Sequence, residues 1–534
     1  MKRPIVLLIA ISYLMVSCSG NASLWGQYQT PTPPGGIQPS PSPLPTIVNP
    51  STSTPVITLT PEATVTPTAT RFDEVFVTQE VASQIESTPT LQGGNPTILY
   101  YTQSGDWLPA VARRFGVDVT AITSPKILPE KGLLDPGTLL MIPDVLDRSV
   151  PYTSGLQLLP DNEFVFTATA VDFDTAAYVR DAGGYLSAYR EYLGSTGWTS
   201  GAGALERVAT ENSVNPRLLL AILDYESGWV RGRPENDFRI TYPLGYENFR
   251  NKGVYGQISW AANQLSMGYY GWRSGTLTEI RFSDGSSLRI EPNLNAGTVA
   301  LMYYFARQHS LNEWLRIMDQ TGGFASYYQN MFGDPWSRAD AIGPIFPPGI
   351  SQPEMDLPFE PRAAWAFTGG PHGAWETEGP LAALDFAPAS ATTGCDPNTR
   401  WILSAAPGLV VRSGAGVVVV DMDGDGSEQT GWNILYLHVA AKDRVAQGEW
   451  VDITNAIGHA SCEGGIATGT HLHIARKYNG EWVSADGPIP FVLSGWTVFA
   501  GERPYQGRLV KGDREIIADL YAQLRSLIFR EDDE

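Results

Sequence analysis

Hydrophobic and polar positions change their spacing along the chain, and these changes divide it into regions. The first region holds two short β-prone runs, 97–102 and 139–143. Between them, residues 108–115 have the apolar spacing of a helix that stops at Gly116. This pattern predicts a strand, a helix and a second strand within 97–145.

A second region, from about 172 to 336, has helical spacing. Asn215 followed by Pro216 is a helix start, because asparagine caps the first turn and proline suits its first position. Gly228 is a natural end for that helix. Residues 280–290 interrupt the pattern and are typical of a β-hairpin. The spacing therefore predicts a mainly helical domain over 165–345.

The third region follows the linker signal Phe346-Pro347-Pro348-Gly349, where the periodicity becomes strand-like. The β-prone runs predict an antiparallel β domain over 353–508, and they lie at 408–412, 416–420, 432–439, 456–460 and 471–477. In the tail, apolar residues at helical spacing predict a C-terminal helix within 509–534; they are Ile516, Leu520, Leu524 and Ile528. We expect that helix to dock onto the β domain rather than onto a partner.

The first residues have the pattern of an export signal. Lys2-Arg3 precedes an apolar run that is too short to span a bilayer comfortably, and Cys18 follows it. Residues 14–18 resemble a bacterial lipoprotein box, which implies a signal peptide over 1–18 and membrane attachment through a lipid on Cys18. Ordinary cleavage and an uncleaved anchor are the alternatives. Residues 19–96, rich in Pro, Thr and Ser, predict a disordered, extended linker.

Length, charge and cysteine content limit the number of domains, the class of partner and the state of the cysteines. A chain of 534 residues is too long for a single core and indicates several domains. Its 56 acidic and 36 basic residues give a net charge of -20, which argues against a nucleic-acid partner. Cys395 and Cys462 are the remaining cysteines, and export permits a disulfide between them. Two free thiols are the alternative.

The first module carries the spaced positions of a known glycan-binding domain. They are Tyr101, Gly105-Asp106, Ala112, Phe115-Gly116, Pro136-Gly137 and Ile142-Pro143. The segment resembles a LysM module, which implies a small α+β fold that binds N-acetylglucosamine-containing glycans such as peptidoglycan. Residues 123–126 stand where that family has a second helix. A generic strand-helix-strand unit is the alternative.

The helical domain carries a carboxylic acid at the end of an apolar stripe. Glu226 follows Leu219, Ile222 and Leu223 on one helix face, and partial desolvation suits such a group to donate a proton. Residues 221–228, 253–259 and 293–304 resemble the catalytic helix, cleft motif and later helix of lysozyme-like lytic transglycosylases. The resemblance implies glycan cleavage by Glu226 alone, since Asp224 faces elsewhere. A glycan-binding domain without activity is the alternative.

Histidines concentrate in the β domain. Of six in the chain, five lie between 372 and 473. His471 and His473 are two apart, so a strand presents both on one face. Asp385 lies in an apolar strand, where an unpaired carboxylate is costly and a metal would compensate it. Two histidines and one aspartate fit a catalytic zinc site, and a pair of plain surface histidines is the alternative.

These positions resemble the M23 family of zinc metallopeptidases, the lysostaphin- and LytM-like enzymes that cut peptide bridges of peptidoglycan. The resemblance implies that His372, Asp385 and His473 bind Zn²⁺, and that His438 and His471 are catalytic without binding it. The first two ligands are 13 residues apart (385 − 372), as in the β-lytic branch, which also begins from Gly-Gly-x-His. The family mechanism is metal-assisted hydrolysis, in which both non-ligand histidines transfer protons and stabilise the oxyanion. His459 matches no family position.

An acidic loop stands apart from this pattern. Asp421, Asp423 and Asp425 have the spacing that opens a calcium loop, so Ca²⁺ is a candidate ligand. The twelfth position, where an EF-hand has glutamate, is Trp432. Because β-prone runs flank the loop on both sides, an acidic hairpin turn without metal is the favoured interpretation.

Taken together, the patterns predict a multidomain chain with a small α+β LysM module, a mainly α lysozyme-like domain and an antiparallel all-β M23 peptidase domain. We expect an exported peptidoglycan hydrolase at the cell envelope, with a zinc-dependent endopeptidase activity. A lytic transglycosylase or glucosaminidase with an accessory β domain is one alternative. A non-catalytic scaffold that binds the wall or activates another hydrolase is the other.

Overall fold

The computed structural model describes residues 96–375, 379–389, 394–396 and 398–531. The predicted signal peptide with Cys18, and the predicted linker up to residue 95, lie outside the described residues. Within the described residues, no helix is both long and apolar enough to cross a bilayer.

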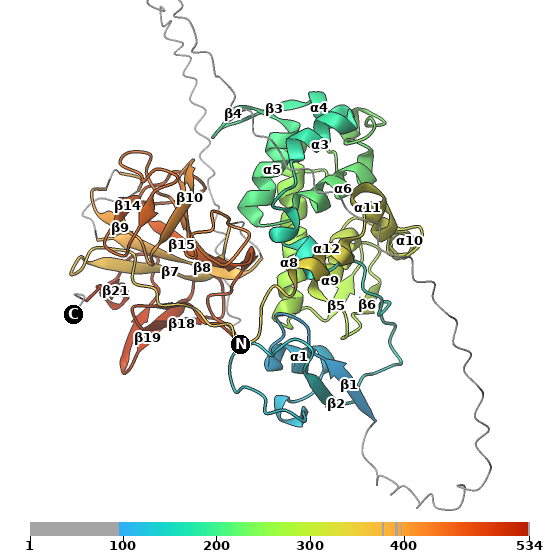
Figure 1. Cartoon of the computed structure of the whole chain (residues 1–534), viewed down its shortest axis with the longest axis horizontal. Coiled ribbons are helices and arrows are strands. Elements are labelled where there is room, and N and C mark those ends of the chain that lie inside the picture. The colour runs from blue at the N-terminus through green and yellow to red at the C-terminus, as the bar shows by residue number, and fades with distance from the viewer. Residues whose placement is uncertain (1–95, 376–378, 390–393, 397, 532–534) are drawn as a thin grey trace, which may run out of the picture. The chain divides into compact units, whose positions relative to one another are not determined.

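The first module has the predicted order of elements, coloured blue in Figure 1. Its elements are β1 (Thr97–Tyr101), α1 (Leu108–Phe115), η1 (Val119–Ala121) and β2 (Leu139–Pro143), and β1 pairs antiparallel with β2. Helix α1 ends at Gly116, whose φ of 70° is the left-handed conformation that glycine adopts most easily. A small core of its own, including Tyr100, Phe115 and Leu140, holds the module together.

The second module is helical and contains two hairpins (Figure 1). Its first elements are α2 (Asp161–Phe164), η2 (Ala168–Ala170), α3 (Thr175–Ala182), α4 (Tyr185–Ala188), β3 (Arg190–Leu193), β4 (Gly197–Ser200), α5 (Gly201–Asn212) and α6 (Pro216–Ser227). Those that follow are α7 (Asp237–Thr241), α8 (Gly253–Arg273), β5 (Glu279–Arg281), β6 (Ser287–Arg289), α9 (Ala296–Ala306), α10 (Leu311–Ile317), α11 (Phe324–Phe332) and α12 (Pro335–Ile342).

The predicted helix start and stop are confirmed at α6. The Asn215 side chain accepts a hydrogen bond from the Arg217 amide (2.9 Å), Pro216 is the first helical residue, and Gly228 ends the helix with φ 63°. The hairpin predicted at 280–290 is formed by β5 and β6.

The third module is built on an antiparallel sheet, as predicted. Its strands are β7 (Trp365–Gly373), β8 (Leu381–Pro388), β9 (Trp401–Leu403), β10 (Gly408–Gly414), β11 (Val417–Asp421), β12 (Trp432–Leu437), β13 (Trp450–Val451), β14 (Ala456–His459), β15 (Leu472–Tyr478) and β16 (Glu481–Trp482). The order in the main sheet is β13-β10-β11-β12-β15-β8-β7-β21, and β16 pairs with β15. This order places β15 between β12 and β8, so segments far apart in sequence meet on one face.

The predicted C-terminal helix is wrong, and the predicted domain end at 508 falls inside a strand. The tail forms β17 (Val492–Leu493), β18 (Trp496–Ala500), β19 (Gly507–Lys511), β20 (Arg514–Ile517), η3 (Leu524–Ser526) and β21 (Leu527–Ile528). Apolar residues four apart also fit a period of two, which is the period of a strand. Leu520 and Leu524 are 68% and 87% exposed, so the expected apolar helix face does not exist. Instead β21 pairs with β7 and adds to the main sheet.

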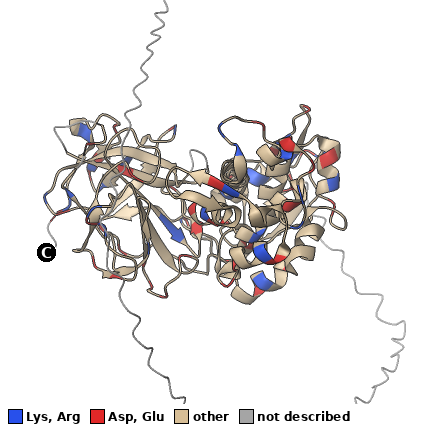
Figure 2. Ribbon diagram, turned by 90° about the horizontal axis from the view of Figure 1, so that it is seen from above, with Lys and Arg blue, Asp and Glu red and all other residues tan. Residues whose placement is uncertain are grey.

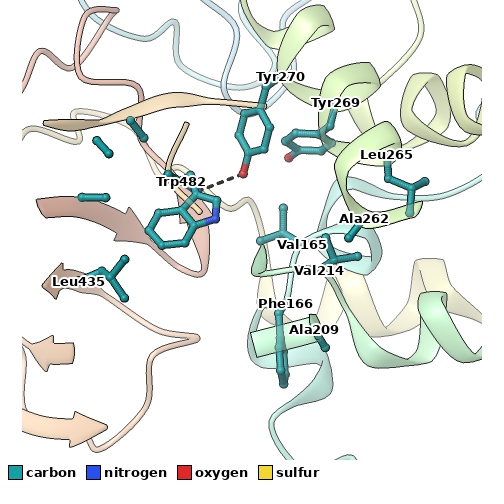
Figure 3. Packing of buried hydrophobic residues seen from close by; sticks show 14 of the residues in the cluster. Val165, Phe166, Ala209, Val214, Ala262, Leu265, Tyr269, Tyr270, Leu435 and Trp482 are labelled. Atoms are coloured by element: carbon teal, nitrogen blue, oxygen red, sulfur yellow. Dashed lines mark hydrogen bonds between the residues drawn. The ribbon is translucent and has the colours of Figure 1, made fainter. Parts of the chain in front are cut away.

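Side chains of the helical module pack against the β16 turn. Trp482 is buried; its amide donates to the Tyr270 hydroxyl (3.2 Å) and its indole Nε1 donates to the Asn212 carbonyl (3.2 Å) (Figure 3). Next to it, Arg273 donates to Glu481 at 3.0 and 2.9 Å and pairs with Asp161 at 3.0 Å. Basic and acidic residues are interspersed along the ribbon (Figure 2). The buried pair of Arg273 and Glu481 is one place where opposite charges are in contact.

Candidate metal centre

The candidate centre begins with the glycine pair before His372. Strand β7 departs from regular pairing with β8 between Phe367 and Gly373, which turns His372 toward the neighbouring strand. A Cβ added to Gly369 would lie 2.7 Å from Oδ2 of Asp385, and one added to Gly370 would lie 2.4 Å from the Gln506 carbonyl. Glycine is therefore required at both positions for the strand to approach Asp385 and the tail.

The three predicted zinc ligands meet at one point. Asp385 on β8 lies directly opposite His473 on β15, so their side chains share a face of the sheet. Oδ1 of Asp385 is 3.2 Å from Nε2 of His372 and 3.3 Å from Nδ1 of His473, and these two nitrogens are 3.0 Å apart. All three side chains are buried. Strand pairing thus brings together side chains that lie about a hundred residues apart in the sequence.

Backbone carbonyls fix which ring nitrogen of each histidine is free. Nδ1 of His372 lies 2.8 Å from the Gly370 carbonyl, and Nε2 of His473 lies 2.9 Å from the Ala374 carbonyl. A carbonyl only accepts hydrogen bonds, so each of these nitrogens carries the proton. The opposite nitrogens, Nε2 of His372 and Nδ1 of His473, therefore point at Asp385 with lone pairs.

The carboxylate of Asp385 supports the assignment of a cation to this point. Its Oδ1 is buried and has no hydrogen-bond donor, although it faces ring nitrogens of His372 and His473. A buried oxygen without a donor is costly unless a cation compensates it. Two neutral imidazoles and one carboxylate form a donor set that suits Zn²⁺. The residues present thus fit the metal that the sequence predicted.

The two predicted catalytic histidines lie beside the ligands. The rings of His438 and His471 are 4.4 Å apart between centroids, and Nε2 of His471 is 3.7 Å from Oδ1 of Asp385. Nδ1 of His438 donates to the Glu463 carbonyl (2.8 Å), and Nδ1 of His471 donates to the Gly469 carbonyl (2.8 Å). Both rings therefore present Nε2 toward the centre.

The environment of His438 keeps its ring neutral. Burial, together with the neighbouring His471, lowers the pKa of His438 to about 4. The residue also has φ 65°, a left-handed conformation that is uncommon for a side chain of this size. Strained backbone of this kind is often held at functional sites by the surrounding structure. Here the Ser461 amide and hydroxyl both donate to the His438 carbonyl, at 2.8 and 2.9 Å.

A cleft of about 670 Å³ opens beside Asp385 and His471. Its other wall is formed by the tail, through Pro504, Tyr505, Gln506, Ala518, Asp519, Leu520, Tyr521 and Arg525. The ring of Tyr505 stacks on that of His372, with centroids 4.2 Å apart. Sequence reasoning missed this wall because no local pattern links the tail to the histidines. The turn between β18 and β19 carries Pro504, Tyr505 and Gln506, and the segment after β20 carries the other residues.

His459 and the disulfide lie at the edge of this region. The rings of His459 and Trp401 are in contact, with centroids 3.8 Å apart and planes at 32°, and His459 lies outside the ligand cluster. Cys395 and Cys462 form a disulfide, as the sequence analysis favoured. Next to Cys395, the Gly394 and Asp396 carbonyls accept hydrogen bonds from Thr470 at 2.8 Å each. The disulfide thus ties the segment before β9 to the segment before β15.

The helical module places Glu226 in a different setting. Oε1 of Glu226 is 3.1 Å from Nε2 of His309, and the carboxylate side chain is only 5% exposed. His309, the sixth histidine, was not singled out from the sequence. Asp224 turns to other partners, Arg231 (2.6 Å) and Tyr327 (2.9 Å). The catalytic role of Glu226 stays a prediction.

Comparisons with known proteins agree with the class of site. The family model described as the LasA N-terminal domain matches residues 157–345, the region predicted to be lysozyme-like. Protease LasA of Pseudomonas aeruginosa is 27% identical over 349 residues, covering 62% of this chain and 75% of that protein. The beta-lytic metalloendopeptidase of Lysobacter enzymogenes is 27% identical over 159 residues, covering 28% of this chain and 82% of that protein.

Among solved structures, the M23 metalloprotease pseudoalterin is 22% identical, with a TM-score of 0.28, and covers 34% of this chain and all of that one. The His-Asp-His centre and the two curated relatives define this chain as a metalloendopeptidase. The chain is similar to LasA over 62% of its length and to the beta-lytic enzyme over 28%.

Proposed function

We propose that this enzyme is a zinc-dependent endopeptidase that cuts the peptide bridges of bacterial peptidoglycan. The observation that carries the proposal is the buried group of His372, Asp385 and His473, in which the carboxylate oxygen lacks a donor and faces two free imidazole nitrogens. The resemblance of the sequence to M23 enzymes supports peptidoglycan as the substrate. The extended cleft beside the centre has room for a peptide chain.

His372, Asp385 and His473 would hold the metal. When bound, zinc polarises a peptide carbonyl and lowers the pKa of water, so that water attacks at neutral pH. The chain's own part is to supply proton transfer and charge stabilisation. His438, neutral at pH 7 with Nε2 free, suits the acceptance of a proton from the attacking water. His471 presents its Nε2 on the same side and suits stabilisation of the developing oxyanion.

The decisive experiment compares the wild-type chain with His473→Ala and with His459→Ala as a matched control. We expect about one zinc ion per wild-type chain and digestion of purified peptidoglycan with release of new amino termini. His473→Ala should lose both, whereas His459→Ala, outside the ligand cluster, should keep both. Absence of zinc in the wild type, or equal release by His473→Ala, contradicts the proposal.

We propose glycan cleavage by the helical module as a second activity. The carboxylate of Glu226 supports it, because its side chain is only 5% exposed and lies 3.1 Å from Nε2 of His309, a polar partner that can orient an acid/base group. Glu226→Gln should abolish release of anhydro-sugar or reducing ends, while Glu235→Gln, an exposed acid in the following loop, should not. If wild type and Glu226→Gln release equal amounts, the module does not cut glycan.

We also propose that the first module binds glycan strands and that the chain is exported and held at the envelope through Cys18. The exposed ring of Tyr101 on β1 and the LysM resemblance support glycan binding. Tyr101→Ala should weaken sedimentation of the full chain with insoluble peptidoglycan, and equal sedimentation would count against this role. Metabolic labelling with a fatty acid tests the lipid, since Cys18→Ser should remove the label.

A further inference from the structure

The hairpin loop between β11 and β12 gathers three carboxylates away from the catalytic histidines. Oxygen atoms of Asp421, Asp423 and Asp425 lie within 4.8 Å of one another. Asp421 is fully buried at the end of β11, while the other two are exposed. Three negative charges this close repel one another unless a cation lies among them.

No basic side chain compensates these carboxylates within the described part of the chain. Their hydrogen-bond partners are amide and hydroxyl groups: Asp421 accepts from the Gly426 amide (2.8 Å) and Asp425 accepts from the Thr430 hydroxyl (2.6 Å). The neighbouring acid Glu428 is different, because Arg412 and Lys477 both pair with it, at 2.6 and 2.8 Å. The nearby basic groups are thus already engaged by Glu428.

An independent observation comes from Asn433 on β12. It lies directly opposite Asp421 in the sheet, so both side chains extend from the same face. Its Nδ2 donates to the Thr430 carbonyl (2.7 Å), which holds the amide against the loop. Asn433 is 0% exposed, and its Oδ1 has no hydrogen-bond donor. A fully buried amide oxygen without a donor, directly across the sheet from Asp421 of the acidic cluster, suits a cation as a further ligand.

Burial and the neighbouring carboxylates raise the pKa of Asp421 to about 6, as expected where negative charge gathers without a partner. The donor atoms are all oxygen and come from a loop rich in glycine. Calcium accepts such irregular oxygen sets, whereas magnesium demands near-octahedral geometry and zinc prefers nitrogen or sulfur.

We propose that Asp421, Asp423, Asp425 and the Oδ1 of Asn433 bind a calcium ion. The EF-hand pattern failed at its twelfth position, Trp432, because the additional ligand comes from the next residue on β12. The ion has a structural role: β12 leads from this loop to His438. The Gly431 amide at the loop's end donates to the Asn479 side chain (2.9 Å), beside the turn that packs on the helical module.

Terbium luminescence tests the site without using catalysis. Trp450 lies over the loop, since a Cβ added to Gly424 would be 2.8 Å from its ring atom Cζ3. Tb³⁺ replaces Ca²⁺ at oxygen sites, and a nearby tryptophan transfers excitation energy to it. The full chain, loaded with zinc, is titrated with Tb³⁺ under tryptophan excitation and then back-titrated with Ca²⁺ or Mg²⁺. Calorimetric titration with Ca²⁺ alone gives the stoichiometry.

We expect one Ca²⁺ per chain, with a dissociation constant of about 10⁻⁵ to 10⁻³ M, and displacement of Tb³⁺ by Ca²⁺ at least ~10-fold more effective than by Mg²⁺. The double substitution Asp423→Asn/Asp425→Asn should weaken binding at least ~10-fold, because it removes two charges while keeping side-chain shape. Asp513→Asn, in the turn between β19 and β20, is the matched control and should bind as the wild type does.

Three results would overturn the proposal. The first is the absence of both a heat of Ca²⁺ binding and Tb³⁺ emission in the wild type. The second is binding by the double variant as tight as that by the wild type, and the third is displacement of Tb³⁺ by Mg²⁺ as effective as that by Ca²⁺. Because Asp423 and Asp425 are exposed, the double variant should fold, and its circular dichroism spectrum checks this. The zinc centre stays occupied throughout, so failure here does not depend on the peptidase proposal.

Discussion

Replacement of Trp482 by alanine tests whether the β16 turn holds the peptidase module to the helical one. Trp482 is 3% exposed and belongs to a buried cluster that includes Tyr270 of the helical module and Leu435 of the β module (Figure 3). Removal of a buried tryptophan costs about 3–5 kcal/mol through lost burial and the cavity left behind. The Asn212 carbonyl also loses its donor, which adds roughly 1 kcal/mol. We therefore expect a loss of about 4 kcal/mol or more, largely in the docking of the modules.

Urea unfolding of the zinc-loaded full chain measures this loss, followed by tryptophan fluorescence and by far-ultraviolet circular dichroism. If docking is weakened, the unfolding curves from fluorescence and from circular dichroism should no longer coincide, since the modules then unfold independently. Trp450→Ala is the control, because that side chain is 59% exposed and its removal should cost under ~1 kcal/mol. A transition for Trp482→Ala that coincides with that of Trp450→Ala would refute the reasoning.

Three other substitutions test the site, the disulfide and the buried charges. Gly369→Ala should weaken zinc binding at least ~10-fold, because the new Cβ would displace Asp385. Gly469→Ala is the control, since a Cβ there has its nearest neighbour at 3.5 Å. Competition with a chelator measures the zinc affinity of each variant, and equal affinities of the two would contradict the prediction. Cys395→Ser/Cys462→Ser should lower stability by about 4 kcal/mol, as estimated from a closed loop of 67 residues, and wild type that unfolds identically with and without reductant would refute this. Burial raises the pKa of Glu428, but Lys477 and Arg412 outweigh it and lower the pKa to about 2. Because this lies below the unfolded value of ~4.3, ionised Glu428 with its two basic partners stabilises the fold fully above about pH 5. About 3 kcal/mol of the free energy of unfolding is lost as the pH falls to 2. Glu428→Gln should be less stable than wild type at pH 7 and should lose less stability between pH 5 and 2, and parallel curves would be contrary evidence.

Local signals in the sequence predicted much of the secondary structure. The cap at Asn215 and the stop at Gly228 define α6, and the β-prone runs of the third region became strands. Local signals failed in the tail, where the spacing of Ile516 and Leu520 suits a helix and a strand equally well. Pairing of β20 with β19 placed Ile516 in a strand, and pairing partners are not visible in a local pattern.

The sequence by itself determined which residues form the candidate centre. Residue types and their order singled out His372, Asp385, His473, His438 and His471 through their resemblance to the M23 zinc peptidases. Only the tertiary structure decided how they act together. Cross-strand register set Asp385 opposite His473, and backbone carbonyls chose the free nitrogen of each ring. The contacts of His473 with Asp385 and of Tyr505 with His372 join segments far apart in sequence, and the place of Asn433 opposite Asp421 depends on the pairing of β12 with β11. A local pattern shows neither, because it does not contain the pairing partner.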